Sequence, residues 1–126
     1  MSVMCGYCNQ PAALVRGPAV YPHRPDLRGL QFHICRPCGA WIGCERGTTN
    51  PLGTLANAEL RRARMDAHAA FDPSWKGNKR RRGERYAWLA ERLGIPRAAC
   101  HIGHFDLAMC RRVVDVCLID AVRGVH

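Results

Sequence analysis

The 126-residue sequence predicts an α+β protein, in which a small antiparallel ribbon over residues 1–50 precedes a three-helix module over residues 51–126. The first part is rich in glycine, proline and cysteine, and its short apolar runs are bounded by turn-forming residues. The second part carries apolar residues at helical spacing. An apolar fraction of 48% is ordinary for a folded chain, so disorder is not expected.

Four short runs in the N-terminal part are expected to be extended, because each lies between turn formers. A structured loop is expected between the second and third runs, where Pro22, Pro25 and Gly29 interrupt regular structure. A sheet this small cannot bury a stable core alone, so it is expected to need a bound metal ion for stability. The four runs are residues 12–16, 20–21, 30–34 and 40–43.

Apolar residues in the C-terminal part recur at the spacing of three helices. The first helix is expected to begin near Asn57, the second to span residues 83–93, and the third to begin after Asp106. Gly94 should end the second helix, because glycine accepts a left-handed conformation, and Pro96 prevents its continuation. The apolar faces are Leu60, Ala63, Ala67, Ala70 and Phe71; Tyr86, Leu89, Ala90 and Leu93; and Cys110, Val113, Val114, Cys117, Leu118 and Ala121.

Two C-x-x-C pairs stand 26 residues apart in the N-terminal part. Zinc prefers tetrahedral coordination by thiolates, and the tight turn of a C-x-x-C pair brings two sulfurs to one ion. Two such turns supply all four ligands and leave no position for water or substrate, so the ion is expected to be structural. The sequence therefore predicts a zinc ribbon that holds one Zn²⁺ ion through Cys5, Cys8, Cys35 and Cys38.

Other uses of these cysteines compete with zinc. Eight cysteines also suit a secreted disulfide framework, but the paired spacing and an N-terminus unlike a secretory signal favour metal and a cytoplasmic location. Redox dithiols lack their expected strand-to-helix setting, and nothing else in the sequence indicates an electron-transferring iron–sulfur cluster. His33 or Cys44, which lie close to the second pair, could replace one ligand, although Cys44 suits the small core of the ribbon better.

A second group of metal-binding residue types, Cys100, His101, His104 and Cys110, falls within eleven residues. Two cysteines and two histidines could close another tetrahedral site. Alternatively, Cys110 and Cys117 are small core residues of the third helix, since free cysteine is commonly buried, and His101 bonds a loop carbonyl.

The chain is basic, with a formal net charge of +9 from 17 Arg, 2 Lys and 10 acidic residues. A filled zinc site lowers this charge to about +7, because four thiolates bring −4 and the ion +2. The planar fork of arginine grips phosphate, which suits nucleic acid, although genome base composition explains the bias equally well. Residues 76–85 are expected to form a polar loop whose four consecutive cations, at residues 79–82, need an acidic partner.

Basic and aromatic residues also share the faces of the first two helices, with Trp75 and Trp88 among the arginines. Such rows can hold phosphates while rings stack on bases. Alternatively, the two tryptophans pack the ribbon against the helices, and the arginines form a solvated face. The candidate contacts to nucleic acid or to an acidic protein surface are Lys76, Lys79, Arg80, Arg81, Arg82, Arg61, Arg64 and Arg85.

Catalysis and membrane insertion are not expected. His68 and Asp72 lie one helical turn apart, but no spacing matches a nuclease site and no glycine-rich loop can cradle phosphate. No run approaches the roughly 18 apolar residues that a membrane helix requires.

Several longer motifs together resemble a zinc-finger-containing family of phage, prophage and bacterial proteins. The motifs span the chain from Cys5 to about Cys117: CGYC, YPHRPDL, CRPCGAWIGC, PLGTLANAELRRARMDAHAAFDPSW, RYAWLAERLGI and CHIGHFDLAMCRRVV. The resemblance implies a zinc ribbon followed by helices, with the four paired cysteines as ligands and no established activity. It also implies that the position of His104 is not fixed as histidine, which disfavours a second metal site.

These observations together predict a non-enzymatic, zinc-stabilised nucleic-acid-binding protein that a phage or mobile element encodes. The alternative is a protein that binds an acidic host surface and thereby modulates or inhibits a nucleic-acid machine, such as RNA polymerase or an RNA-guided defence complex.

Overall fold

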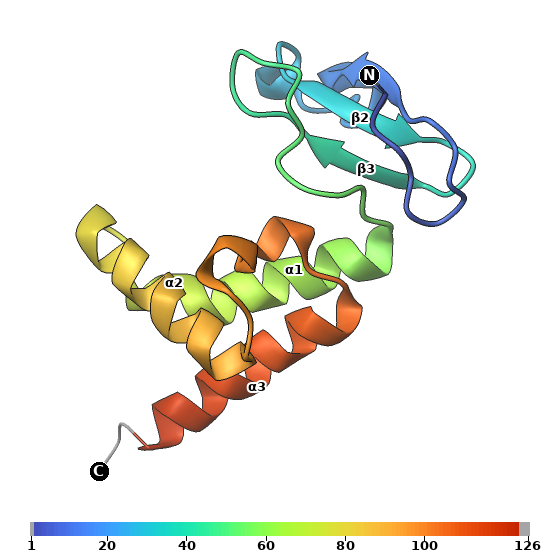
Figure 1. Cartoon of the computed structure of the whole chain (residues 1–126). Coiled ribbons are helices and arrows are strands. Elements are labelled where there is room, and N and C mark those ends of the chain that lie inside the picture. The colour runs from blue at the N-terminus through green and yellow to red at the C-terminus, as the bar shows by residue number, and fades with distance from the viewer. Residues whose placement is uncertain (1, 124–126) are drawn as a thin grey trace. The chain divides into compact units, whose positions relative to one another are not determined.

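The structure is a computed structural model and describes residues 2–123 of the chain. It separates into two compact units, Met1–Glu59 and Leu60–His126, the first built around strands and the second around helices (Figure 1). The predicted α+β class is confirmed. The first unit ends at Glu59, whereas the sequence analysis ended it at residue 50. Isolated bridges from Cys44 to Pro51 and from Trp41 to Ala56 explain the difference, because they join residues 51–56 to the strands.

The first unit contains a three-stranded antiparallel sheet in the order β1-β2-β3. Its strands are β1 (Ala13–Arg16), β2 (Gln31–Cys35) and β3 (Ala40–Gly43), which match three of the four extended runs. In the register, Ala13 faces Ile34 and Cys35 faces Ala40. The hairpin between β2 and β3 therefore places Cys35 at the end of one strand and Cys38 in the turn that follows.

The prediction that residues 20–21 are extended is wrong. A 3-10 turn, η1 (Gly17–Ala19), follows β1 directly, and the N–H groups of Val20 and Tyr21 both donate to the carbonyl of Gly17. A Cβ on Gly17 would lie 1.9 Å from the carbonyl oxygen of Leu27, so only glycine allows this close approach. The local turn hydrogen bonds take the backbone groups that a strand would have needed.

The core of the first unit is small. Cys5, Cys35, Ala40 and Leu55 are its buried members. Apart from this cluster, the ring of Tyr21 packs edge-on against those of Phe32 and Trp41, at centroid distances of 5.6 and 6.2 Å. Two of the four buried residues of this cluster are cysteines, so a metal ion bound there would stabilise a core that is otherwise small.

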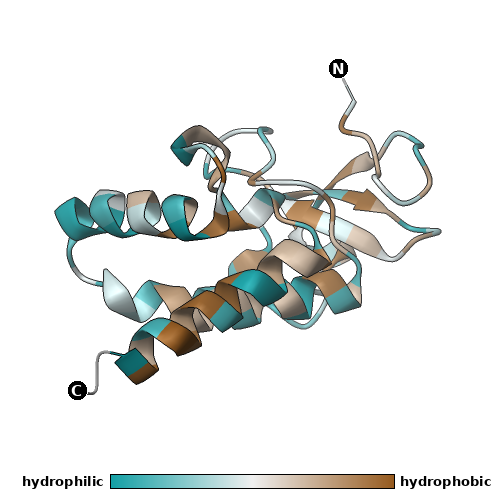
Figure 2. Cartoon of the chain, turned by 60° about the horizontal axis from the view of Figure 1, so that its bottom comes forward, coloured by the Kyte–Doolittle hydropathy of each residue, from teal (hydrophilic) through white to brown (hydrophobic). Residues whose placement is uncertain are grey.

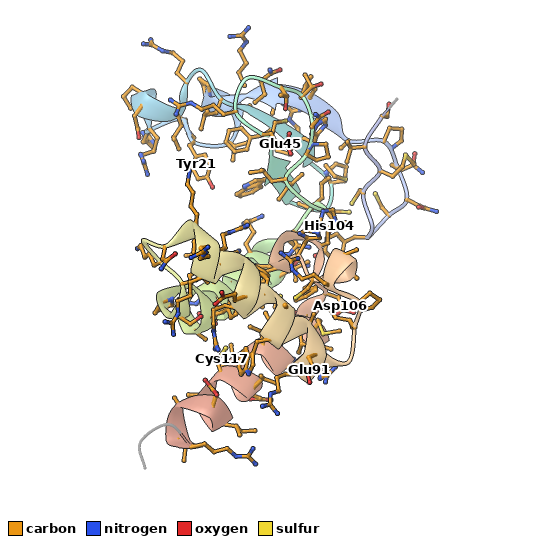
Figure 3. All side chains as sticks on the ribbon, turned by 60° about the vertical axis from the view of Figure 1, so that its left-hand side comes forward. Tyr21, Glu45, Glu91, His104, Asp106 and Cys117 are labelled. Carbon is orange, nitrogen blue, oxygen red and sulfur yellow. The ribbon has the colours of Figure 1, made fainter. Side chains whose placement is uncertain are left out.

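The second unit contains three long helices, α1 (Ala58–Phe71), α2 (Lys79–Leu93) and α3 (Leu107–Arg123). The helix α1 begins directly after Asn57, as expected. At the start of α3, the Asp106 Oδ1 atom accepts a hydrogen bond of 2.9 Å from the N–H of Met109, so Asp106 is the predicted N-cap (labelled in Figure 3). Gly94, at φ 71°, ends α2 in the left-handed conformation that was also predicted.

Helix α2 begins earlier than the sequence suggested, and this corrects the expected loop at residues 76–85. Asn78 is its N-cap, because the side-chain oxygen accepts a 3.1 Å hydrogen bond from the N–H of Arg81. Lys79 to Arg82 therefore form the first turn of the helix. Gly83 lies at an exposed position inside α2, where it costs helix stability without interrupting the hydrogen bonds.

The core of the second unit joins all three helices. Its largest fully buried side chains are Phe71, Leu89, Ile102 and Val113. The expected buried face of α3 continues only partway, because Leu118 is 58% exposed. Ala121 is exposed as well, so the C-terminal half of α3 departs from the prediction. None of the helices in residues 2–123 is both long and apolar enough to cross a bilayer.

Candidate metal centre and cationic surface

Each C-x-x-C pair lies in a tight turn of the first unit. The first turn is closed by an isolated bridge between Met4 and Pro11, and the Cys5 N–H donates to the carbonyl of Gln10 at 2.9 Å. The second turn is the β2–β3 hairpin, where Gly39 takes a φ of 62°. Two backbone hairpins thus present two cysteines each, as the spacing predicted.

The four sulfur atoms of Cys5, Cys8, Cys35 and Cys38 converge, since all of them lie within 4.8 Å of one another. The Sγ atoms of Cys8 and Cys35 are 3.6 Å apart. Zinc–sulfur bonds of about 2.3 Å in a tetrahedron place sulfurs about 3.8 Å apart, so the donor set fits one zinc ion. Cys5 and Cys35 are buried and the other two are half-buried. The chain therefore has a structural zinc centre with four protein ligands.

The alternatives to this ligand set are not supported. The structure joins none of the eight cysteines in a disulfide, and four of them converge on the metal site instead. His33 is buried, but its Nε2 atom contacts the carbonyl oxygen of Thr49 at 2.8 Å. In the described part of the chain, neither His33 nor Cys44 belongs to a group of converging ligand atoms.

The crowded thiols differ in acidity before metal binds. Interaction with the Cys8 thiol, together with burial, raises the pKa of Cys38 to about 12. Burial also raises the pKa of Cys5, but hydrogen bonds from the backbone N–H groups of Tyr7 and Cys8 and from the neighbouring thiols outweigh it and lower the pKa to about 7. The cluster as a whole therefore loses its first proton easily, and zinc must displace the protons that are held more tightly.

The second predicted cluster is not assembled into a metal site. Cys100 and Cys110 are fully buried in the helical core, and burial raises the pKa of both thiols. His101 and His104 are exposed, with ring centroids 6.0 Å apart. Among residues 2–123, the four paired cysteines form the one group of convergent ligand atoms.

Positive charge is concentrated in the second unit. Residues 60–126 hold 14 of the 19 basic residues and seven of the ten acidic residues, a net charge of +7. The first unit carries +2, which four thiolates and a zinc ion bring to about zero. The helical unit therefore carries the excess charge of the zinc-loaded protein.

Five of the predicted contacts gather around the start of α2, and all of them are exposed. The first turn of α2 contains no acidic residue. The Arg81 Nε atom donates a hydrogen bond of 2.7 Å to the carbonyl of Ser74, which holds the Arg81 side chain in place. These residues are Lys76, Lys79, Arg80, Arg81 and Arg82.

Arg97 joins this group, although sequence reasoning did not single it out. Its guanidinium lies 5.1 Å from the centre of the Tyr86 ring, and that of Arg82 lies 4.8 Å from the same ring. Arg82 also lies 5.2 Å from the ring of Trp75. Neither arginine makes an ion pair with the carboxylates of the described chain. We call Lys76, Lys79, Arg80, Arg81, Arg82 and Arg97 the α2 cationic surface.

The other predicted contacts lie elsewhere. Arg64 is only 7% exposed, and its Nε and Nη2 atoms donate to the carbonyl of Phe105 at 3.2 and 3.1 Å, so it is a core residue. Arg85 stacks on Trp88 at 4.0 Å and pairs with Asp120 at 3.6 Å. Both arginines are therefore engaged within the protein and are not part of the exposed basic surface. Arg61 is half-buried on α1, far in sequence from the start of α2, and is already engaged in a contact of its own.

The aromatic and acid–base candidates serve the helical unit itself. Trp75 and Trp88 are half-buried and pack against the helical core. His68 Nδ1 lies 3.0 Å from Asp72 Oδ2, a pairing of residues one turn apart at the end of α1.

The chain was compared with known families and proteins. A family model described as a zinc-finger-containing domain matches residues 1–119, a span that includes the four cysteines and most of α3. The resemblance seen in the sequence motifs is thereby confirmed. No curated protein and no solved structure matches the chain.

Proposed function

The chain belongs to this zinc-finger-containing family, and from that premise we propose that it is a non-enzymatic nucleic-acid-binding protein. The α2 cationic surface carries the proposal. Six exposed basic side chains gather there, and residues 79–82 present four of them in one helical turn. The zinc ion has no open coordination position, so its role is to hold the first unit together.

The position of these charges on the helix supports a polyanionic ligand. The N-terminus of a helix carries about half a unit of positive charge, and unpaired N–H groups point out of it. Acidic residues are favoured there, yet the first turn of α2 is entirely basic. Each cation at this end therefore costs stability in the free protein, and a bound phosphate would relieve the repulsion.

The arrangement of Arg82 and Arg97 supports the same ligand. Both guanidiniums lie about 5 Å from one ring, that of Tyr86, which is itself buried. The ring attracts both cations, so it positions two planar hydrogen-bond donors around one side chain. Two such donors suit successive phosphate oxygens of a nucleic-acid backbone.

The proposal is tested by removing the first-turn charges. The variant replaces Lys79, Arg80, Arg81 and Arg82 with alanine, a strong helix former, and keeps every apolar residue of α2. Fluorescence anisotropy with a labelled duplex and a labelled single strand measures affinity over a salt series. We expect weaker binding to every sequence, and a salt slope lower by up to about 0.9 for each lost duplex contact.

A matched control removes the same number of charges elsewhere. Arginines 16, 28, 46 and 111 are exposed and lie outside the α2 cationic surface. Their joint replacement with alanine should keep most of the affinity. If both quadruple variants weaken binding equally, the contact is a diffuse effect of net charge. If the unmodified protein binds neither strand form at low salt, the nucleic-acid proposal fails, and an acidic host protein becomes the partner to test.

Both probes are used, because exposed basic side chains can contact the phosphates of a duplex or of a single strand. The origin of the chain in a phage or mobile element stays a prediction from the sequence motifs.

A further inference from the structure

The C-terminal half of α3 carries an apolar face that no described part of its own unit covers. Leu118 is 58% exposed, Ile119 54% and Val122 67%. Cys117, labelled in Figure 3, is half-buried and precedes them. Residues 118 and 122 are one helical turn apart, and residue 119 lies beside them, so the three side chains form one continuous patch. Figure 2 shows apolar residues continuing along α3 toward its C-terminal end.

The charges around this patch have a self-complementary pattern. Asp115, Ile119 and Arg123 are spaced four residues apart, so they follow one another along the same face of α3. Asp115 and Arg123 are both exposed, and neither forms an ion pair within residues 2–123. The acidic residue lies one turn before the centre of the patch, and the basic residue one turn after it.

We propose that this face of α3 binds the same face of a second copy of the chain, with the two helices antiparallel. A two-fold axis near Ile119 would place Asp115 of each copy opposite Arg123 of the other, forming two equivalent ion pairs. A two-fold interface requires a surface that complements itself, and this stripe meets that condition in both apolar and charged residues.

A shallow hollow beside the patch offers a place for the partner's side chains. Trp88 of α2 and Val116 and Ile119 of α3 line it, together with Arg92, Asp120 and Arg123. The apolar part of this lining would receive an apolar side chain of the partner, while its charged part stays at the rim. Because a few apolar side chains meet on each copy, the dimer should form reversibly and depend on concentration.

The inference does not rest on the proposed function, and the two have separate tests. A dimer would carry two α2 cationic surfaces, which would strengthen binding to one long polyanion through linkage of the two contacts. The mass of the protein alone, without nucleic acid, decides whether the dimer exists.

Sedimentation equilibrium over a range of protein concentrations tests the proposal. The expected mass rises from 14.1 kDa toward about twice that value as concentration increases. Ile119→Asp should abolish the rise, whereas Met65→Asp, which changes an apolar side chain 64% exposed on α1, should not. Circular dichroism confirms that both variants keep their helices. A monomer at millimolar concentration, or a dimer that resists Ile119→Asp, would overturn the proposal.

Charge exchange tests the antiparallel pairing itself. Asp115→Arg should weaken the dimer about tenfold, because arginine would then face the partner's Arg123 at two symmetric positions. Arg123→Asp should weaken it similarly. The double variant carries both exchanges and should recover most of the lost affinity. If the double variant dimerises no better than the single ones, the two helices do not pair in this register.

Discussion

Reversing the charge at the start of α2 separates the stability of the helix from its proposed function. Lys79 and Arg80 occupy the first two positions of the helix and are exposed, and their side chains make no hydrogen bond or ion pair within the described chain. Glutamate at these positions would face the positive end of the helix dipole. The Lys79→Glu, Arg80→Glu variant should therefore be more stable than the unmodified protein and should bind nucleic acid more weakly.

The size of the stability change follows from the helix end. A charge in the first turn changes stability by about 0.3–1 kcal/mol, and reversal both removes an unfavourable charge and adds a favourable one. Two reversals at exposed positions, discounted for screening, should stabilise the helical unit by about 1–2 kcal/mol at low salt. For a unit of this size, that corresponds to a melting temperature higher by roughly 4–15 °C.

Thermal unfolding followed at 222 nm measures this gain, and anisotropy with a labelled duplex measures the expected loss of affinity. The gain should shrink at high salt, where the helix dipole is screened. Arg92→Glu is the matched control, because it places an acidic residue in the last turn of the same helix and should destabilise it. A destabilised Lys79→Glu, Arg80→Glu protein would refute the helix assignment, and unchanged affinity would show that the binding surface lies elsewhere.

Three further predictions concern the zinc centre and a buried arginine. Cys35→Ser should lower the zinc content from one ion per chain to none and unfold the first unit, because metal binding supplies its folding energy. Elemental analysis measures the zinc content and NMR the folding of the unit, and a folded zinc-free variant would contradict the prediction. Zinc affinity should fall as pH falls, because zinc must compete with protons for the thiolates. The fall should be steeper below the Cys5 pKa of about 7, where protons compete at every ligand. Competition with a chromophoric chelator measures the affinity, and a pH-independent affinity would exclude thiolate ligands. Arg64→Ala should destabilise the helical unit by about 2–3 kcal/mol in denaturant unfolding, because the Phe105 carbonyl loses its buried arginine donor. Nucleic-acid affinity should stay unchanged. Lost affinity in a folded variant would show that Arg64 contacts the nucleic acid after all.

Local features of this protein could be predicted from its sequence. The C-x-x-C spacing specifies two ligands in each tight turn, so Cys5, Cys8, Cys35 and Cys38 required no knowledge of the tertiary structure. The caps at Asp106 and Gly94 are also local, because each depends on hydrogen bonds or dihedral angles within a few residues.

Features that depend on distant residues were missed. Arg64 lies on α1 among apolar positions, and it is buried because the Phe105 carbonyl, 41 residues later, accepts its hydrogen bonds. Arg97 joins the α2 cationic surface through the ring of Tyr86, which it contacts as Arg82 does from the first turn of α2. The start of α2 was missed for a different reason. The run of cations indicated a loop, and the N-cap role of Asn78 outweighed their unfavourable charge.

The central claim is that the α2 cationic surface contacts nucleic acid, and an NMR titration tests it most directly. Zinc-loaded, ¹⁵N-labelled protein is titrated with a short unlabelled oligonucleotide, first as a single strand and then as a duplex. The account predicts that the largest shifts fall on the backbone amides of residues 76–82 and on the Arg97 side chain, while amides around the zinc ligands change little. Shifts confined to the zinc ribbon, or no shifts at low salt, would contradict it.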